Sequence, residues 1–549
     1  PALFSNNLYY RDVNGYGITD VVKLFATNLI IYENLGGSSG QFNPIVKNHS
    51  LGWDSKTVFD FADFDGDGAL ELIAKNTEYC CLDILSLYPK TSPKSRLLEA
   101  VKNGFNSKTK FNYDFLTTSP TYQKENGNIY PLAHMQAAFP IVASVEGNDG
   151  IGGQAITSYV YEKAKVHKQG KGFLGFDKVI AINQTTGYTI ETEFNEPTLI
   201  EFYARQIKKQ TIKLTSNQSL VSETNNTNSF NSLGNKRYWA RTDASTTTDH
   251  INTMSVTTTS VYDVNGNLTQ QTTNNGVETS TIVNSNYTSQ GSWLPTSPQT
   301  IVATNTRQGK PAYSRTTNFT YNNQGSVVTE IQDPSLSKQV TTTFAYNQLG
   351  NNTLVKVSAA GLQDRQTTSV FDSKGRLPEQ TTNSLNQTEY RTYDYRWGKP
   401  LSVTGIDGLI TSFTYDGLGK LKTETDPKGV TTAYNYLWDI GQGGSATGTT
   451  NNNHIYYVEV SNPGNPDVKT WFDVHDREII TQTDGFSQPI FTVTSYDQRG
   501  NVATSTTPFY QNSPIPAVVT TNTYDVYSRL IQTQNSAGTS TRSYSASAG

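Results

Sequence analysis

Acidic side chains at alternate positions make residues 63–71 the first candidate for chemistry. Asp63, Asp65 and Asp67 follow one another at every second position, and Glu71 closes the run. Oxygen ligands at alternate positions, with glycines that permit a sharp bend, suit a hard cation such as Ca²⁺. The backbone carbonyl of Ala69 would supply one further ligand. The pattern predicts a structural calcium site, and its alternative is an acidic surface turn that binds nothing.

A weaker copy of this run lies about 50 residues earlier, a period that suits one four-stranded propeller blade per repeat. Asp12, Asn14 and Asp20 repeat the spacing of the acidic run, but Tyr16 stands where the third carboxylate should be. Fewer anionic ligands predict weaker cation binding. In both copies an apolar pair follows the acidic run, which indicates that a strand begins there. The two runs therefore predict the end of a β-propeller, with a second and weaker calcium site.

The other groups that could do chemistry form no recognisable catalytic pattern. The six histidines are scattered, and none has the spacing of a metal-binding pair. No serine stands in a nucleophile-elbow pattern. The sequence therefore predicts a protein that is not an enzyme. The histidines are His49, His134, His167, His250, His454 and His475.

The composition favours strands and turns, and it argues against two classes of partner. Of 549 residues only 16% are charged, 11% are aromatic with 32 Tyr, and the net charge is −4. A nucleic-acid-binding chain would be strongly basic. No apolar run reaches the roughly 20 residues of a membrane-spanning helix. We therefore expect an all-β protein that contacts no nucleic acid and has no direct membrane span.

A repeat organises the second half of the chain. Each unit has an aromatic residue, then Asp or Asn, two further residues, usually Gly, a polar residue, and Leu or Val. The units follow one another at about 25 residues, and about eleven of them tile residues 260 to 530. Degenerate copies are expected at Tyr287, with Gly291, and near Tyr436. Clear copies begin at Tyr262, Phe371, Tyr415 and Tyr496, a copy without the Gly begins at Tyr524, a copy with one extra residue begins at Tyr393, and weaker copies begin at Tyr321, Tyr346 and Phe472.

Each unit is predicted to be a β-hairpin. A strand ends at the aromatic residue, Asp or Asn starts a tight turn, and Gly supplies the positive φ that the turn needs. One unit cannot bury its apolar face alone, so the units must pack side by side in a long curved sheet. The recurring aromatic rings are expected to stack in a ladder. Asp426-Pro427-Lys428-Gly429 is predicted to be one of these turns, and the glycine-rich run Gly441–Gly448 an insertion between hairpins.

The tyrosine–aspartate units resemble the YD repeats of bacterial RHS proteins. The acidic run resembles the FG-GAP or VCBS repeats that precede such arrays. The middle of the chain, with Tyr159-Val-Tyr161 and Gln169-Gly-Lys-Gly-Phe-Leu-Gly175, is similar to the middle region of SpvB/TcdB-like B components of insecticidal toxin complexes. The order of the three regions also resembles that family. The boundaries implied are a partial propeller over 1–85, a toxin-like middle region over 86–235 and a YD-repeat β-shell over 236–549.

The resemblance implies a function in delivery. In that family the repeats form part of a hollow shell around a C-terminal effector, and the propeller docks on a translocating partner. The expected partners are therefore a C-terminal effector or C component, absent from this chain, and a translocating protein. A secreted or cell-surface bacterial location is implied. The alternative is a cell-surface adhesion or carbohydrate-binding protein, and enzymatic activity remains only for a segment outside this chain.

Overall fold

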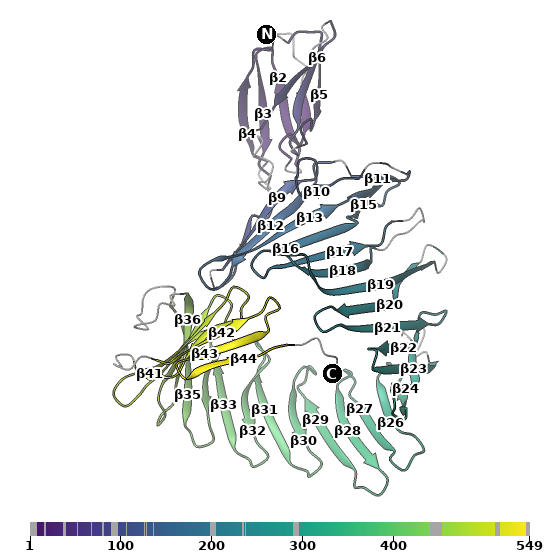
Figure 1. The fold of residues 1–549 in the computed structure, drawn as a ribbon, viewed down its shortest axis with the longest axis vertical. Coiled ribbons are helices and arrows are strands. Elements are labelled where there is room, and N and C mark those ends of the chain that lie inside the picture. Colours follow the sequence, from purple (N-terminus) through teal and green to yellow (C-terminus); the bar gives the residue numbers. More distant parts are fainter. Residues whose placement is uncertain are drawn as a thin grey trace. The chain divides into compact units, whose positions relative to one another are not determined.

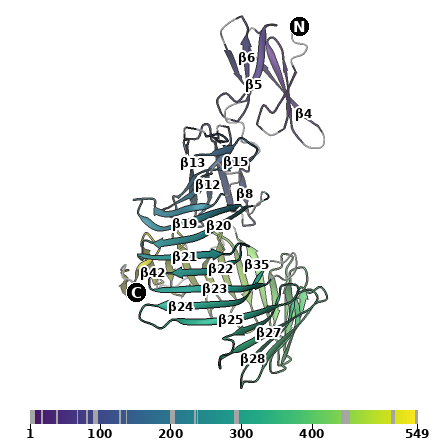
Figure 2. The ribbon, with the colours of Figure 1, turned by 90° about the vertical axis from the view of Figure 1, so that its right-hand side faces the viewer.

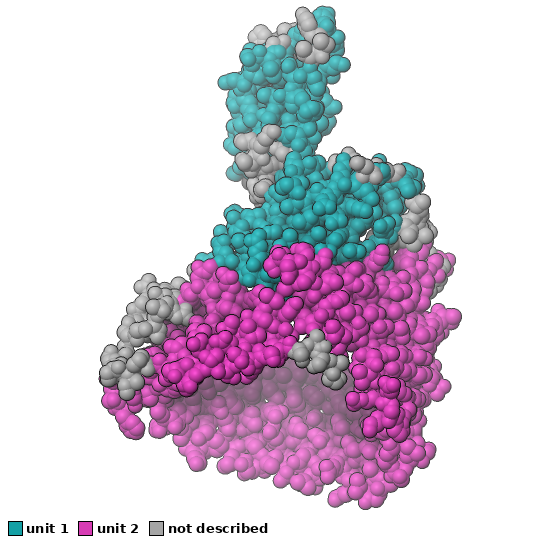
Figure 3. Space-filling model, viewed as in Figure 1, with its two compact units in different colours: residues 1–148, 154–205 teal, residues 149–153, 206–549 magenta. Residues whose placement is uncertain are grey.

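The computed structural model consists of strands, turns and loops. It describes residues 8–544 except 16–17, 37–39, 52, 67, 79–81, 89–96, 106, 126, 128, 136, 198–204, 233–234, 236–237, 289–295, 440–452 and 511–516. Every regular element in these residues is a β-strand, which confirms the all-β prediction. The described part of the chain accordingly offers no helix that could cross a membrane. The chain divides into two compact units, one with residues 1–148 and 154–205 and one with 149–153 and 206–549 (Figure 3).

Unit 1 begins with two small antiparallel sheets. Strands β1 to β4 form a four-stranded sheet in chain order, and β5 to β7 form a three-stranded sheet. Figure 1 shows both sheets in purple near the N-terminus. Residues 1–85, which the sequence predicted to be the end of a propeller, contain these two sheets except for the last residue, Ser86. The strands are β1 (Leu8–Arg11), β2 (Asp20–Leu24), β3 (Asn28–Asn34), β4 (Phe42–Asn48), β5 (Thr57–Ala62), β6 (Glu71–Asn76) and β7 (Leu82–Ser86).

One apolar core joins these two sheets. Alternate residues of β2, β3 and β6 point inward, as the period of two in a strand requires. Trp53 and Phe59 complete the core, with ring centroids 4.9 Å apart. The two sheets therefore bury a common apolar face. The buried residues are Val13, Val22, Leu24, Leu29, Ile31, Trp53, Phe59, Leu72, Ala74, Leu87 and Tyr88.

The rest of unit 1 consists of a larger set of mostly antiparallel strands and a further three-stranded sheet. Strands β8, β9, β12, β13, β16 and β17 pair in that order, and β10 runs parallel to β13. A three-stranded sheet of β11, β14 and β15 lies apart from it. The strands are β8 (Ala100–Lys102), β9 (Lys108–Phe115), β10 (Tyr122–Gln123), β11 (Leu132–His134), β12 (Pro140–Asn148), β13 (Gln154–Glu162), β14 (Lys165–His167), β15 (Gly172–Gly175), β16 (Lys178–Asn183) and β17 (Tyr188–Phe194).

Unit 2 is an array of antiparallel strands that pair largely in chain order, with β39 also pairing with β41 and β40 with β42. The first strands are β18 (Ile207–Leu214), β19 (Leu220–Ser232), β20 (Tyr238–Asp249), β21 (Met254–Tyr262), β22 (Leu268–Asn274), β23 (Glu278–Thr288), β24 (Ser297–Arg307), β25 (Tyr313–Tyr321), β26 (Val327–Gln332), β27 (Val340–Tyr346), β28 (Asn352–Ala359), β29 (Arg365–Phe371) and β30 (Pro378–Thr382). Next come β31 (Thr388–Asp394), β32 (Lys399–Thr404), β33 (Ile410–Tyr415), β34 (Leu421–Thr425), β35 (Thr431–Trp438), β36 (His454–Ser461), β37 (Val468–Asp473), β38 (Glu478–Thr483), β39 (Ile490–Tyr496), β40 (Val502–Thr506), β41 (Phe509–Tyr510), β42 (Val519–Tyr524), β43 (Leu530–Asn535) and β44 (Gly538–Thr541).

The array of unit 2 is strongly curved. Figures 1 and 2 show β19 to β28 following one another along one wall, after which the sheet turns and continues through β44. In the described residues this sheet is curved but not closed, and Figure 3 shows the hollow that it borders. The prediction of a long curved repeat sheet is therefore confirmed. The curvature follows from the right-handed twist that each added strand contributes.

The unit that begins at Tyr415 shows how one repeat is built. Strand β33 ends at Tyr415, where the register shifts by one residue against β34. The Asp416 carboxylate accepts hydrogen bonds from the backbone N–H groups of Leu418 and Lys420, both at 2.8 Å. Gly419 closes the turn with φ of +78°. The carboxylate thus caps the turn, and the hairpin prediction is confirmed.

The repeat tyrosines make a contact that the sequence did not indicate, in at least six of the repeats. The phenol of Tyr415 donates a 2.7 Å hydrogen bond to the carbonyl of Pro400, where the strand before the preceding turn begins. Tyr321, Tyr346, Tyr393, Tyr496 and Tyr524 donate equivalent bonds. Ring stacking, which was expected throughout, is seen between Tyr456 and Phe472 at 5.0 Å. The ladder is therefore largely one of hydrogen bonds from phenols to carbonyls.

Two further predictions concern single segments of the array. Asp426 caps a turn, since its carboxylate accepts the N–H groups of Lys428 and Val430 at 2.9 and 2.8 Å. That turn has the same hydrogen bonds as the tyrosine–aspartate turns, as predicted. Gly291 and the run Gly441–Gly448 lie outside the described residues.

Candidate functional site

Three of the predicted calcium ligands converge. One carboxylate oxygen from each of Asp63, Asp65 and Glu71 lies within 4.8 Å of the other two. Asp63 and Asp65 follow β5, and Glu71 is the buried first residue of β6, so one β-turn region presents all three. Asp67 lies outside the described residues. Ala69 is buried beside the group. The sequence spacing therefore identified a real acidic cluster.

Backbone groups hold two of these carboxylates in place. Glu71 Oε2 accepts the N–H of Phe64 at 2.7 Å, and Asp63 Oδ2 accepts the N–H of Gly68 at 3.2 Å. Asp63 Oδ1 is buried and accepts no hydrogen bond from any described residue. A buried oxygen of this kind is costly unless something binds it. A hard cation between the three carboxylates would satisfy that oxygen and offset their mutual repulsion.

The loop that carries the cluster is pressed against residues 115–117 of the same unit. A Cβ on Gly66 would lie 2.6 Å from Cβ of Thr117, and one on Gly68 would lie 3.0 Å from the Phe115 ring. The Thr117 hydroxyl also donates to the Gly66 carbonyl. The glycines of the acidic run are therefore required both by a positive φ and by close packing.

In the weaker predicted calcium site, Asp20 and Asn14 make hydrogen bonds within the fold. Asp20 is fully buried, and its carboxylate accepts the backbone N–H groups of Val13 and Asn34 at 3.2 and 2.8 Å. Asn14 is buried and donates to Glu33 Oε1 at 3.1 Å. Burial raises the pKa of the Asp20 carboxyl above its ordinary value. The second set differs from the first because it has two carboxylates, Asp12 and Asp20, whereas three carboxylates converge at Asp63, Asp65 and Glu71.

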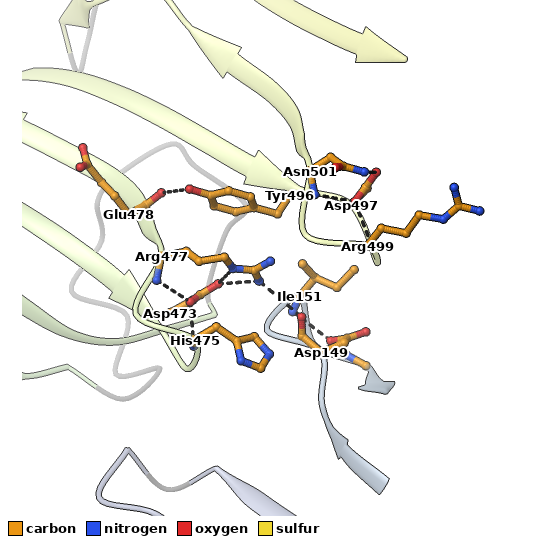
Figure 4. A network of polar contacts seen from close by, with 11 residues as sticks. Asp149, Ile151, Asp473, His475, Arg477, Glu478, Tyr496, Asp497, Arg499 and Asn501 are labelled. Atoms are coloured by element: carbon orange, nitrogen blue, oxygen red, sulfur yellow. Dashed lines mark hydrogen bonds and ion pairs between the residues drawn. The ribbon is translucent and has the colours of Figure 1, made fainter. Parts of the chain in front are cut away.

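A buried polar network in unit 2 was missed by the sequence analysis (Figure 4). Asp473 is fully buried, and its Oδ1 accepts the N–H groups of His475 and Arg477 at 2.9 and 3.0 Å. Arg477 Nε donates to Asp473 Oδ2 at 2.7 Å, and its guanidinium lies 4.4 Å from the Tyr496 ring centroid. Its Nη2 also donates to the Asp149 carbonyl at 3.3 Å, across 328 residues of chain.

One signal for this network was present in the sequence. Its turn carries Asp476 where most other repeats have Gly, and the backbone there keeps a positive φ of +63°. The loop opposite, residues 149–153, contains three glycines. Neither feature indicates a contact by itself, because the two segments are far apart in the sequence.

Comparisons with known proteins match two parts of this chain to family models. A family model for the insecticide toxin TcdB middle/N-terminal region matches residues 34–202. An RHS repeat model matches residues 393–432. No curated protein matches the sequence.

Solved structures of toxin complexes share the fold. The structure of TcdB2-TccC3-TEV matches with a TM-score of 0.70 at 12% identity, over 97% of this chain and 39% of that chain. TcdB2-TccC3 without its hypervariable C-terminal region matches with a TM-score of 0.68, also at 12% identity, over 97% of this chain and 39% of that chain. The Photorhabdus luminescens Tc holotoxin pore matches with a TM-score of 0.58 at 11% identity, over 96% and 42%.

These matches agree with the motifs. At such low identity the solved structures establish the fold, whereas the two family models establish the middle region and a repeat. The chain spans about two fifths of the length of the matched structures. The resemblance found in the sequence is confirmed: this chain is similar to RHS-repeat, TcdB-like components of insecticidal toxin complexes.

Proposed function

We propose that this chain is a shell segment of a toxin-complex protein that encloses an effector and helps to deliver it. The observation that carries this proposal is the curved repeat sheet of unit 2, which borders a hollow and has the fold of the TcdB2-TccC3 structures. A wall of this kind is a suitable container because each strand pairs its backbone with its neighbours, so few backbone groups remain to bind the contents. The contents lie outside this chain.

The proposed partners follow from the same matches. The solved structures contain TcdB2 together with TccC3, so a C component is the first candidate for what this chain assembles with. The Tc holotoxin pore suggests an extracellular toxin and a translocating protein as second partner. The two N-terminal sheets would contact that protein if they belong to a propeller. The adhesion interpretation receives no support from these matches.

The proposed role needs no catalytic group. Enclosing an effector depends on the shape of the wall and on its stability, and contacts inside the fold account for two of the histidines. His49, for example, stacks on Trp53 with ring centroids 3.8 Å apart, and His167 Nδ1 accepts the N–H of Gln169 at 3.2 Å. We therefore propose a non-enzymatic function for this chain.

Co-expression with a TccC-type C component tests the proposal. We expect the two proteins to elute together, and we expect the C-terminal segment of the C component to resist added protease in the complex. The C component alone, at the same protease concentration, is the control. Failure to elute together, or digestion as fast as in the free C component, would contradict the proposed function.

We also propose that the cluster of Asp63, Asp65 and Glu71 binds a structural Ca²⁺. The buried and unbonded Asp63 Oδ1 supports this proposal, together with the convergence of three carboxylates within 4.8 Å. The Ala69 carbonyl and Asp67 would be further ligands. Asp12, Asn14 and Asp20 remain a weaker candidate, because Asp20 already accepts two backbone hydrogen bonds.

A further inference from the structure

The hairpin turn at 473–477 differs from the other turns of the array. The residue after the turn aspartate is valine in three repeats, which permits a direct comparison. Val264 is 92% exposed and Val526 is 44% exposed, whereas Val474 is only 7% exposed. Turn tips of this sheet normally point into solvent, so something covers the tip at Val474.

The arginine of the same turn is also unusually covered. Arg376 and Arg477 occupy equivalent positions, and each pairs with the aspartate four residues before it. The side chain of Arg376 is 45% exposed, whereas that of Arg477 is 18% exposed. Asp473 and the Tyr496 ring both hold the Arg477 guanidinium, so it is fixed before it contacts anything else.

The loop 149–153 is the segment that meets this turn. Arg477 Nη2 donates to the Asp149 carbonyl at 3.3 Å. Gly150 has φ of +77°, and a Cβ there would lie 2.3 Å from Arg477 Nη2 and 2.6 Å from Cδ2 of His475. The Arg477 side chain cannot move aside without losing its contacts with Asp473 and the Tyr496 ring. Only glycine therefore fits at position 150.

The loop is itself held in a single shape. The buried Asp149 carboxylate accepts the N–H groups of Ile151 and Gly153 at 2.9 and 2.8 Å, both through Oδ1. A Cβ on Gly153 would lie 2.4 Å from Asp149 Oδ2, so glycine is also required there. A rigid loop and a fixed arginine lose little conformational entropy when they meet.

We propose that the turn 473–477 is an intramolecular docking site and that the loop 149–153 is the segment that occupies it. Both segments belong to unit 2. The ladder pairings of that unit join strands that lie close in the chain, whereas this contact joins residues 328 apart. Such a contact can open without breaking any strand pairing. When it opens, Arg477 and His475 lose the contact with the loop and become more accessible. The inference does not depend on what unit 2 encloses.

Hydrogen–deuterium exchange of the full chain tests whether the loop 149–153 docks on the turn 473–477. Gly150→Val should speed amide exchange in 149–153 and in 473–477 about ten-fold, because the added side chain cannot share the space with Arg477. Gly361→Val is the matched control, since Gly361 has φ of +75° and open space around its Cβ. Gly361→Val imposes the same backbone strain, but its added Cβ contacts no other residue. Equal effects of the two variants at 473–477 would overturn the proposal.

A second pair of variants decides the question if the valine variant does not fold. Arg477→Gln should speed exchange in 149–153, whereas Arg376→Gln should leave that loop unchanged. Both arginines pair with a turn aspartate and lie over a tyrosine ring, at 4.4 Å for Arg477 and 4.7 Å for Arg376. Unchanged exchange in 149–153 after Arg477→Gln would refute the docking.

Discussion

At the residue scale, three aspartates show how the surroundings of a carboxylate decide its use. Asp416 is a turn cap whose oxygens accept backbone N–H groups. Asp20 is a fully buried cap between two segments. Asp63 keeps one buried oxygen that accepts no hydrogen bond from the described residues. The first two are satisfied by the backbone, and only the third has a buried oxygen available for a cation.

The first prediction concerns that cation. Calcium should raise the melting temperature of the chain, and Asp65→Ala should abolish this rise. At a calcium concentration 100 times the dissociation constant the stabilisation would be about 2.7 kcal/mol. Differential scanning calorimetry with calcium and with a chelator measures the effect.

The control for this prediction removes a carboxylate of the same region. Asp60 lies exposed on β5, outside the cluster, so Asp60→Ala should keep the calcium response of the wild type. An equal calcium response in Asp65→Ala and the wild type would show that the cluster does not bind calcium.

The second prediction concerns the repeat tyrosine. Tyr415→Phe removes the 2.7 Å hydrogen bond to the Pro400 carbonyl and should lower the free energy of unfolding by about 1 kcal/mol. Tyr390→Phe is the control, because Tyr390 lies half-exposed on the nearby strand β31. Urea unfolding followed by circular dichroism measures both. The hydrogen bond would be unimportant if the two variants unfolded at the same urea concentration.

At the element scale, the hairpins are joined to one another by side chains as well as by strands. Lys399 Nζ donates to the Gly419 carbonyl of the next turn at 2.6 Å, and Asn351 Nδ2 donates to the Gly375 carbonyl at 2.8 Å. Thr425 of β34 and Thr431 of β35, which belong to successive hairpins, share a 2.9 Å hydrogen bond. Each hairpin therefore contacts its neighbour at the turn, through the tyrosine, and along the strand.

The third prediction concerns alkaline pH. Burial raises the pKa of Tyr321, Tyr415, Tyr496 and Tyr524 above the ordinary phenol value. In unit 1 burial raises the pKa of Tyr161 to about 12. The folded state thus favours the neutral phenols. Their contribution to the free energy of unfolding is complete below about pH 10, and it is lost as the pH rises through the raised pKa values of the folded state.

Absorbance at 295 nm and urea unfolding test this prediction together. As the pH is raised from about 10 to about 12, we expect the urea concentration at the unfolding midpoint to decrease while the phenolate absorbance rises. An uncoupled result, in which all tyrosines ionise near pH 10 while the midpoint stays constant, would contradict it.

Local chemistry explains which elements the sequence could predict. The strand end at Tyr415 and the cap at Asp416 were predictable, because both depend on residues within one hairpin. The bond from Tyr415 to Pro400 was not, since it depends on the spacing of neighbouring strands. The docking of Gly150 against Arg477 was also beyond sequence reasoning, because no local preference links residues so far apart.

At the scale of the whole molecule, the two units are stabilised by different means. The N-terminal sheets of unit 1 share an apolar core of eleven buried residues. Unit 2 is largely one curved sheet, and its buried apolar cluster is Trp471, Ile479, Ile480 and Phe491. Arrays of this kind gain stability mainly from contacts between neighbouring repeats. Stability within unit 2 should therefore vary along the chain.

The last prediction is that β37 to β39 exchange their amide protons more slowly than any other described strands of unit 2. Ile479 and Ile480 are adjacent in β38 and both are buried, so both faces of that strand are covered. In β33, by contrast, exposed residues alternate with half-buried ones, and β34 has no fully buried residue. Because fully burying each such side chain contributes about 1.5–3 kcal/mol, local opening should cost more in β38. Hydrogen–deuterium exchange resolved by peptide compares the two hairpins directly. Equal protection in β33–β34 and β37–β39 would mean that backbone pairing alone, and not buried apolar area, sets the local stability of the array.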